Sequence, residues 1–563
     1  MNLLHLITIH SILFAGLFLY GRSLFKIYSI VAGKKHLYIF DIKITYFYPL
    51  VGIAFLSNIL FVINFFTPLD NYWIVYTVLL IPLLINYERD IDFNITLKTL
   101  TPLLFSPFLI SFYNNNPSGD AFMYHFQNQI YIYEEKIVFG LSNLFPNLGF
   151  VSIVEYLSVL LWNERNYGLV SFVNILFLTG FYYFIIGLWD TEDKRLKNLS
   201  IIVLFISLLD NIGLGGGRNG YFFIQEIGKF DASFGIIFFI CFILILIISQ
   251  KSEIDNLDVY AAFLFVLFSG QIKSTGYILF LPLLIIIFAR RNFDIFKLIY
   301  KNYLLLSISF LWIVRSLINS ACLIFPIDST CISNLKWHFS GQAKLLSQGI
   351  ISNNRNPALP YEAYGNYDWI DSYWFPENKT YLINFLITLI VIYILTFSKT
   401  RIKINTGYTI LLLAAIFNIT VWFLFFPNYR FSVGFILSLY IVLLYKNLES
   451  ENLILKKIHE NKFIFFIILL TSAVLVVRLD SYKIAFANPN EDIVERYQLP
   501  IQDYVENEDS FGVMPVNGKC FINIDCSTST YKIKLTDFNG HKMFIPVDSD
   551  YNLEYLKKLQ EDK

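Results

Sequence analysis

Apolar segments as long as a bilayer is thick recur along most of this 563-residue chain, and they constrain its fold more than any other feature. A helix needs about 20 mostly apolar residues to cross a membrane, with a range of roughly 17–25. Windows of that size predict about fourteen spanning helices, which indicates an all-α polytopic membrane protein. The predicted spans lie near residues 3–22, 45–66, 72–87, 98–113, 167–188, 198–213, 233–249, 257–270, 276–289, 303–319, 381–397, 406–426, 431–446 and 463–478.

Composition excludes the main alternatives to a membrane protein. Charged residues make up only 15% of the chain, whereas a soluble domain carries roughly 25%. An aromatic content of 18% excludes a disordered chain, which lacks large apolar side chains. Lys plus Arg and Asp plus Glu balance at 43 each, so we expect membrane lipids and no nucleic acid among the partners.

The positions of Lys and Arg predict the orientation, because cytoplasmic loops of membrane proteins are enriched in these residues. Cation-rich and cation-poor loops alternate only if the apolar segment 147–162, which contains Glu155, does not cross the membrane. We therefore expect an interfacial helix there, with both termini outside. The residue usage suggests a bacterium, and hence a multi-pass protein of the bacterial cytoplasmic (inner) membrane. The cation-rich loops are 22–43, 194–197, 290–301, 399–403 and 456–462.

Three segments on the predicted outer, periplasmic side are long enough to carry chemistry. They are the loops 114–166 and 320–380 and the tail that follows residue 479. We predict a transmembrane domain over 1–479 and a small mixed extracytoplasmic domain over 480–563. Within the tail, 519–526 and 529–535 indicate short strands and 552–560 a terminal helix.

The cysteines support this orientation. Cys322 and Cys331 lie in the second outer loop, and Cys520 and Cys526 lie in the tail. Each pair is close enough in sequence to close a small loop, and disulfides persist in oxidising compartments. We expect two disulfide bonds, with four unrelated thiols as the alternative.

Asp120 is the first candidate for chemistry. It follows a Pro-Ser-Gly turn outside the fourth span and precedes Tyr124 and His125. A carboxylate there can accept a proton from an attacking hydroxyl or ligate a divalent cation, and the histidine can transfer protons. The alternative is a helix N-cap, for which Asp is a preferred residue. The same two interpretations apply to Asp231, where a turn leads into the seventh span.

Three cations complete the candidate set. Arg315 lies inside an apolar stretch near the outer end of its span, Lys273 in a short outer hairpin and Arg430 on an outer turn. Ionisable residues at membrane depth tend to mark function. The alternative for Lys273 and Arg430 is that their charges reach the lipid headgroups. No loop contains a phosphate-binding GxxxxGK[ST] motif, so we expect chemistry on the outer face, where activated substrates are usually lipid-linked.

Five short stretches, in a common order from about 118 to 434, resemble a group of bacterial multi-span proteins with the architecture of the GT-C superfamily of membrane glycosyltransferases. The stretches are GDAFMYHFQNQIYIYEEKIVFGLSNLFPNLGF, GKFDASFGIIFF, SGQIKSTGYILFLPL, RSLINSACLIFPI and FFPNYRFSVGF.

The resemblance implies a sugar donor linked to polyprenyl phosphate, and a glycan, glycolipid or protein acceptor on the outer face. Asp120 would then be the base that deprotonates the acceptor in a single inverting displacement, with the phosphate leaving toward Arg315, Arg430 or Lys273. The best-known members carry paired acidic residues on this loop, whereas Glu134 lies well beyond Asp120. A divalent cation such as Mg²⁺ or Mn²⁺ is therefore left open as a cofactor.

Other functions stay open at this point. A polymerase of lipid-linked oligosaccharide repeat units also combines many spans with a large outer loop, and it relies mainly on cations. A lipid or polysaccharide transporter would show internal repeats and binding near the midplane, and the sequence shows no such symmetry. A purely structural membrane subunit would not need Arg315 or an ordered outer loop.

Overall fold

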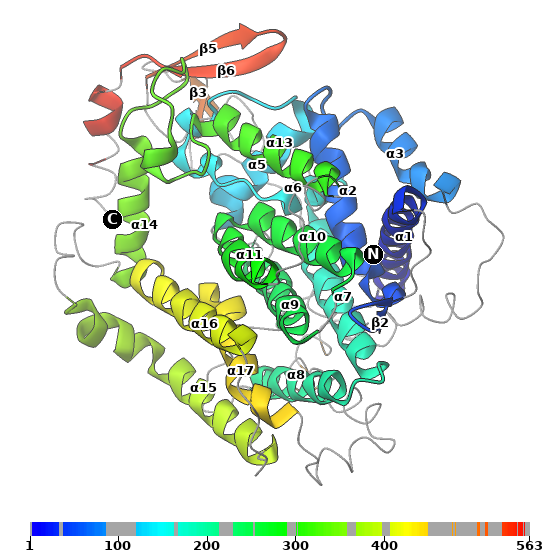
Figure 1. Cartoon of the computed structure of the whole chain (residues 1–563). Helices are drawn as coiled ribbons and strands as arrows, with labels where there is room; N and C mark the ends of the chain where they lie inside the picture. The colour runs from blue at the N-terminus through cyan, green and yellow to red at the C-terminus, as the bar shows by residue number, and fades with distance from the viewer. Residues whose placement is uncertain are drawn as a thin grey trace.

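The computed structural model describes the bundle and parts of the segments around it (Figure 1). The described residues are 3–32, 38–85, 120–162, 167–212, 229–251, 254–289, 300, 302–356, 367–396, 406–448, 476, 479, 483, 504–506, 513–515, 532–548, 550–554 and 557.

The described part of the chain is mostly helical. The longer helices are α1 (Leu3–Ala32), α2 (Tyr48–Asn64), α3 (Tyr72–Ile85), α7 (Phe172–Trp189), α8 (Lys194–Ile212), α9 (Asp231–Gln250), α10 (Asn256–Ile272), α13 (Tyr303–Ser320), α14 (Gln342–Arg355), α15 (Phe375–Thr396), α16 (Thr406–Phe425) and α17 (Val433–Leu448). The shorter helices and turns are η1 (Ile44–Phe47), η3 (Ala121–His125), α5 (Phe126–Glu134), η4 (Leu141–Asn143), η5 (Pro146–Gly149), α6 (Ile153–Val159), η6 (Gly168–Ser171), η8 (Ser274–Leu279), α11 (Phe280–Phe288), η9 (Asp328–Thr330), η11 (Ile370–Trp374) and η12 (Tyr429–Ser432).

Within the described ranges, six helices are long and apolar enough to cross a membrane, and four apolar helices are shorter. These findings fit the predicted all-α membrane protein. The predicted count of about fourteen spans is not confirmed, because most of the predicted spans meet no such criterion or, like 98–113, lie outside the described residues. The six are Leu4–Ile30, Ile44–Asn64, Gly168–Trp189, Asp231–Gln250, Tyr303–Ser320 and Thr406–Phe425.

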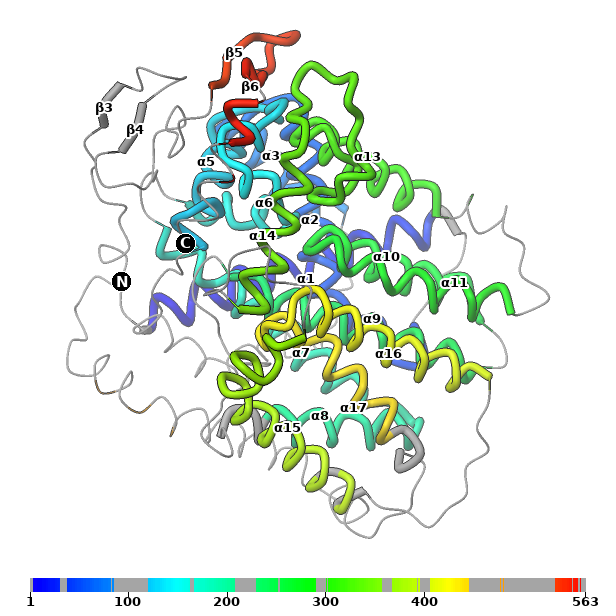
Figure 2. The backbone as a smooth tube through the Cα atoms, turned by 90° about the vertical axis from the view of Figure 1, so that its left-hand side faces the viewer, coloured from blue at the N-terminus to red at the C-terminus, as the bar shows by residue number. Residues whose placement is uncertain are grey.

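Helix α9 forms the centre of the bundle, where it packs against α7, α10 and α17 (Figures 1 and 2). Every one of its residues except Gln250 is buried, as expected for a helix that is apolar all round. Small residues bring α9 and α17 close together. A Cβ atom added at Gly235 would lie 2.4 Å from Val433 Cγ1, and one at Gly434 would lie 2.8 Å from Phe238 Cβ. This close approach places the start of α9 beside the turn that precedes α17.

The segment predicted not to cross the membrane contains only η5 and the seven-residue helix α6. At about 1.5 Å per residue, α6 is too short to span a bilayer. All seven of its residues are buried, and it packs against α2 and α5. Its location at a membrane interface stays a prediction.

Loops predicted to share the cytoplasmic side contact one another. The short hairpin of β1 (Tyr38–Ile39) and β2 (Ile42–Lys43) lies beside the end of α7 and the start of α10. Lys43 Nζ lies 2.6 Å from Asp190 Oδ2, and Lys251 Nζ lies 3.2 Å from both Asp41 and Asp258. The alternation of loops thus predicts which segments meet at one end of the bundle, although which end faces outside stays a prediction.

The described part of the tail docks on the first outer loop. Strands β5 (Ile533–Phe538) and β6 (His541–Pro546) form an antiparallel hairpin, which Figures 1 and 2 show beside α5 and α13. Phe139 N–H donates to Lys542 O, and Phe544 N–H donates to Phe139 O, both at 2.9 Å. Strands β3 (Tyr504–Glu506) and β4 (Val513–Pro515) form a second antiparallel pair.

The predictions for the tail are tested only in part. The predicted strand 529–535 overlaps β5, whereas 519–526 lies outside the described residues, and 550–554 and 557 are helical. Only single residues are described near the boundary at 479, so the division into two domains stays a prediction. The described part of the tail nevertheless shares a small apolar core with both outer loops: Tyr131, Val138, Leu141, Leu144, Leu148, Phe339, Ile533 and Phe544.

One predicted disulfide is present. Cys322 and Cys331 are bonded and close a loop directly after α13. Cys520 and Cys526 lie outside the described residues, so the second disulfide stays a prediction. Cys241 is a free, buried thiol in the middle of α9.

Candidate functional site

Asp120 directs its side chain to a cation and does not cap a helix. It immediately precedes η3, yet its carboxylate makes no capping hydrogen bond. Its Oδ2 lies 3.1 Å from Nη2 of Arg430. Arg430 belongs to η12, and Asn428 caps the start of this turn, where its Oδ1 accepts a hydrogen bond from the Arg430 backbone N–H.

Asp231 joins the same group from α9. It is the first residue of this helix, and its carboxylate forms an ion pair with the ammonium group of Lys273, which follows α10. Its second oxygen lies 3.8 Å from Arg430 Nε. Two carboxylates and two cations from four separate elements therefore meet at one place, which we call the ionic cluster: Asp120, Asp231, Lys273 and Arg430.

The ionic cluster is buried on one side and open on the other. The side chains of Asp120, Lys273 and Arg430 are 31%, 32% and 35% exposed, whereas that of Asp231 is 6% exposed. Both cations also lie over the ring of Phe431, with Lys273 Nζ at 4.5 Å and Arg430 Cζ at 4.7 Å from its centroid. Such cation–π contacts hold a cation in place without neutralising it.

Tyr124 lies between the ionic cluster and the rest of the site. Burial raises the pKa of its hydroxyl above the ordinary value, and the negative charges of Asp120, Asp231 and Glu155 raise it further. Its ring packs on the apolar core that the outer loops share with β5 and β6. The first outer loop therefore links the charged site to the docked tail.

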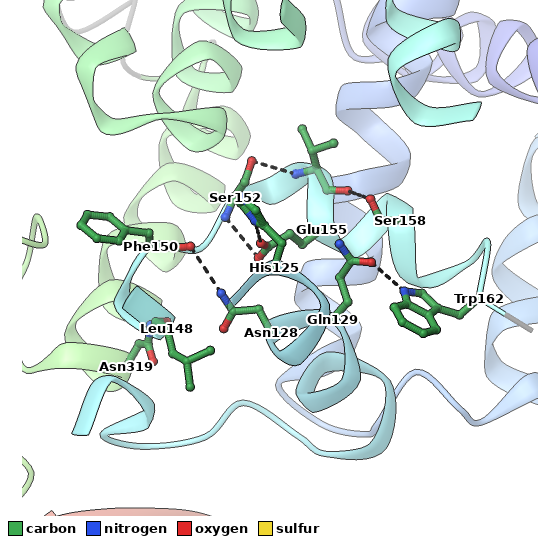
Figure 3. A network of polar contacts seen from close by, with 11 residues as sticks. His125, Asn128, Gln129, Leu148, Phe150, Ser152, Glu155, Ser158, Trp162 and Asn319 are labelled. Atoms are coloured by element: carbon green, nitrogen blue, oxygen red, sulfur yellow. Dashed lines mark hydrogen bonds and ion pairs between the residues drawn. The ribbon is translucent and has the colours of Figure 1, made fainter. Parts of the chain in front are cut away.

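His125 forms a buried pair with Glu155, a residue of α6 (Figure 3). Its Nδ1 lies 2.6 Å from Glu155 Oε1, and the Glu155 side chain is fully buried. Burial raises the pKa of the Glu155 carboxyl, while the hydrogen bond with His125 and the positive charge of Arg315 oppose that rise. His125 also lies close enough to Asp231 for their charges to interact.

Arg315 belongs to the Glu155 side of the site. Its Nε donates to the Tyr156 hydroxyl at 2.9 Å, and its guanidinium lies 5.5 Å from the Trp312 ring centroid. The side chain is buried in α13, as expected for an intramembrane Arg that faces the protein interior. These contacts are with residues outside the ionic cluster. A role of Arg315 toward a phosphate stays a prediction.

A family comparison covers this entire site. A family model described as a domain of unknown function (DUF8201) matches residues 3–437. The chain belongs to the DUF8201 family. The matched region includes every residue of the ionic cluster together with His125, Glu155 and Arg315, and it ends before the tail. No curated protein and no solved structure matches the chain.

The DUF8201 site does not resemble a cation site built from protein ligands. In the part of the chain that the structure describes, no group of three or more His, Cys, Asp or Glu side chains is arranged so that it could hold a metal ion. A divalent cation normally takes several oxygen ligands, whereas Asp120 and Asp231 are paired with Arg430 and Lys273. Among the described residues, these two carboxylates are thus already engaged by cations, and a divalent cation as cofactor stays an untested prediction.

Sequence reasoning missed two members of the DUF8201 site. Glu155 was expected only as part of an interfacial helix, yet the spacing Ser152-x-x-Glu155 is a capping box, which fixes the carboxylate at the start of α6. Phe431 follows Arg430 directly in the chain. Its position under both cations follows from the approach of α9 to α17, and no pattern in the sequence reports that approach.

Proposed function

We propose that this protein is a membrane glycosyltransferase of GT-C type. It transfers a sugar from a polyprenyl-phosphate-linked donor to a glycan, lipid or protein acceptor on the outer face of the bacterial cytoplasmic membrane. The observation that carries the proposal is the ionic cluster, in which two cations and two carboxylates from four elements meet at a partly open place at one end of an apolar bundle.

The two cations suit a phosphate leaving group. Negative charge develops on the phosphate oxygen as the glycosidic bond breaks, and fixed cations nearby stabilise that charge. Arg430 offers a planar group that pairs with phosphate oxygens, and Lys273 offers a compact positive charge. Their contacts with Phe431 and the carboxylates hold both in position before any substrate binds.

The carboxylates suit the sugar. Asp120 is about one-third exposed, so a sugar hydroxyl can reach its free oxygen, while Asp231 keeps both cations oriented from the buried side. The chemistry we propose is a single inverting displacement. The acceptor oxygen attacks the anomeric carbon, its proton passes to a base in the site, and the polyprenyl phosphate leaves toward Lys273 and Arg430. No step requires a metal ion.

The test is a glycan comparison by mass spectrometry. Cells that lack the protein are complemented with the native chain, Asp120→Asn or Asp190→Asn, and equal membrane levels are confirmed by blotting. Asp190→Asn is the matched control, since it breaks an Asp–Lys pair at the other end of the bundle. We expect the deletion to remove a sugar from a surface glycan, and we expect only Asp190→Asn to restore it.

The other outcomes separate the alternatives. Full restoration by Asp120→Asn would favour the polymerase of lipid-linked repeat units or the transporter, because neither depends on this carboxylate. An unchanged glycan profile in the deletion strain would contradict a role in carbohydrate transfer altogether.

A further inference from the structure

The buried pair of His125 and Glu155 has the geometry of a proton acceptor. Glu155 is held on both sides, because its Oε1 meets His125 Nδ1 at 2.6 Å and its Oε2 accepts from the Ser152 backbone N–H at 3.4 Å. A carboxylate accepts a hydrogen bond, so the hydrogen of the neutral imidazole lies on Nδ1. The lone pair of the ring then lies on Nε2, on the far side from Glu155.

The surroundings of His125 leave that second nitrogen available. The ring is held edge-on against Phe230, with 5.0 Å between centroids, and lies against Tyr124 at 4.1 Å. Nε2 makes no hydrogen bond in the described part of the chain, and 11% of the side-chain surface is exposed. Because Phe230 directly precedes Asp231, the ring lies next to the ionic cluster.

Asp120 is less suited to take a proton. Its Oδ2 is engaged by Arg430 at 3.1 Å, so protonation there would break an ion pair that orients the guanidinium. The structure thus gives the two residues different tasks. Asp120 holds a cation, whereas His125 has a fixed ring and an unoccupied nitrogen.

We propose that His125 is the catalytic base of the site and that Glu155 is its positioning residue. The inference rests on the proposed transferase function. The acceptor O–H proton passes to His125 Nε2 as the acceptor oxygen bonds to the anomeric carbon. The electron pair of the broken carbon–oxygen bond stays on the phosphate oxygen of the leaving polyprenyl phosphate. Glu155 stabilises the imidazolium, which then releases its proton to water.

Several titratable and charged groups surround the pair of His125 and Glu155. Asp231 on α9 lies close to His125, and Tyr124 belongs to the same turn as His125. Arg315 on α13 acts on Glu155. Glu155→Gln removes the carboxylate that hydrogen-bonds the ring and leaves the other groups in place. Loss of that charge disfavours the imidazolium, so any process that needs neutral His125 should extend to lower pH.

The first experiment measures the ring itself and needs no substrate. The purified full chain is treated with diethyl pyrocarbonate, which reacts with neutral imidazole, at several pH values, and modification of His125 is followed by peptide mass spectrometry. We expect His125 to react in the native chain and the midpoint of its pH profile to move to lower pH in Glu155→Gln, because the variant lacks the carboxylate beside the ring. His338 is the internal reference, and Glu377→Gln, an exposed carboxyl on α15, is the matched control.

The second experiment measures transfer. Washed cells with native chain, His125→Gln, Glu155→Gln or Asp120→Asn are compared for the rate of sugar addition between about pH 5 and pH 8. We expect about a 100-fold or larger loss for His125→Gln. Glu155→Gln should lower the rate and move the acidic limb to lower pH, whereas Asp120→Asn should lower the rate at every pH without moving the limb.

The two experiments fail in distinguishable ways. An unreactive His125, or an unchanged midpoint in Glu155→Gln, overturns the pair as a proton acceptor whatever the substrate is. Native rates with His125→Gln overturn its role as base while the transferase proposal stands. A third outcome combines the two results. If the pH midpoint of His125 modification moves in Glu155→Gln but deletion of the protein changes no glycan, the pair is supported as a proton acceptor and the transferase proposal is overturned.

Discussion

The two ends of the bundle both carry acidic and basic side chains in contact, but Asp258 at one end is held differently from Asp120 and Asp231 at the other. At the end formed by β1 and β2, Asp258 accepts from the Phe40 backbone N–H at 2.8 Å while it pairs with Lys251. At the other end, Asp120 and Asp231 bond to cations and to no backbone N–H in the described part of the chain. Asp258 therefore fixes the β1–β2 hairpin as well as a cation, whereas the described contacts of Asp120 and Asp231 are with cations.

The largest expected effect comes from removing a cation at each end. Arg430→Ala should reduce sugar transfer about 100-fold or more, because removing one fixed group that stabilises developing charge typically costs that much. Lys43→Ala, which breaks the exposed pair with Asp190, should leave transfer near the native rate. The measurement is the rate of sugar addition at equal membrane levels. Equal losses in both variants would mean that the ionic cluster only stabilises the fold.

The next effect concerns the disulfide-closed loop after α13. Replacing Cys322 and Cys331 together by Ser should lower the free energy of unfolding by about 3 kcal/mol, because the bond restricts the unfolded chain. Thermal unfolding in detergent micelles measures the change, and reduction of the native chain should reproduce it. A midpoint unaffected by either treatment would show that packing alone fixes this loop.

A smaller effect is expected where the tail docks. The Asn143 amide donates to Trp337 O and to Phe544 O, both at 2.9 Å, and so joins three separate segments. Asn143→Ala should destabilise this junction by about 1–3 kcal/mol, because two carbonyl groups lose their donor. Faster amide hydrogen exchange in β5 and β6 would report the loss. Asn354→Ala, which removes one bond within α14, serves as the control and should leave that exchange unchanged.

The smallest effect is a pH dependence in the second outer loop. Partial burial lowers the pKa of His338, although Asp328 opposes the change. As the pH falls below about 6.5, the unfolded chain therefore binds this proton before the folded chain does. The free energy of unfolding is consequently highest above that pH and declines below it. His338→Gln should make the thermal unfolding midpoint less dependent on pH between about pH 5 and pH 7. A slope of the same size in this variant would assign the dependence to other groups.

Much of this comparison could be predicted from residue patterns. Apolar windows locate α2, α7, α9 and α16, and the alternation of cation-rich loops predicts that segments 22–43 and 194–197 share one end, where Lys43 pairs with Asp190. Asp120 and Arg430, more than 300 residues apart, were predicted separately as candidates on the same side. Topology alone brings such residues to one end of a bundle, so the general location of the site is available without a structure.

The pairings within the site could not be predicted in the same way. Whether Arg315 faces Tyr156 or the ionic cluster depends on the rotation of α13, and an apolar helix with one charge does not report its rotation. The inward position of Glu155 could not be predicted, because α6 has only seven residues, too few for a periodic pattern. The helix-cap alternatives for Asp120 and Asp231 also needed side-chain geometry, since a capping Asp and a charge-binding Asp occupy the same place in a sequence.

The docking of β5 and β6 on the first outer loop joins segments that are synthesised at very different times. Asn143 and its acceptor Phe544 are 401 residues apart in the chain. At a translation rate of roughly 5–20 residues per second, the loop that carries Tyr124 and His125 waits roughly 20–80 s for the strand that completes it. Until then the backbone N–H and C=O groups of Phe139 lack these partners, so a chain that ends before β5 and β6 cannot form this contact between the tail and the first outer loop. The first outer loop therefore gains its contacts with β5 and β6 only after the chain has been made through residue 546.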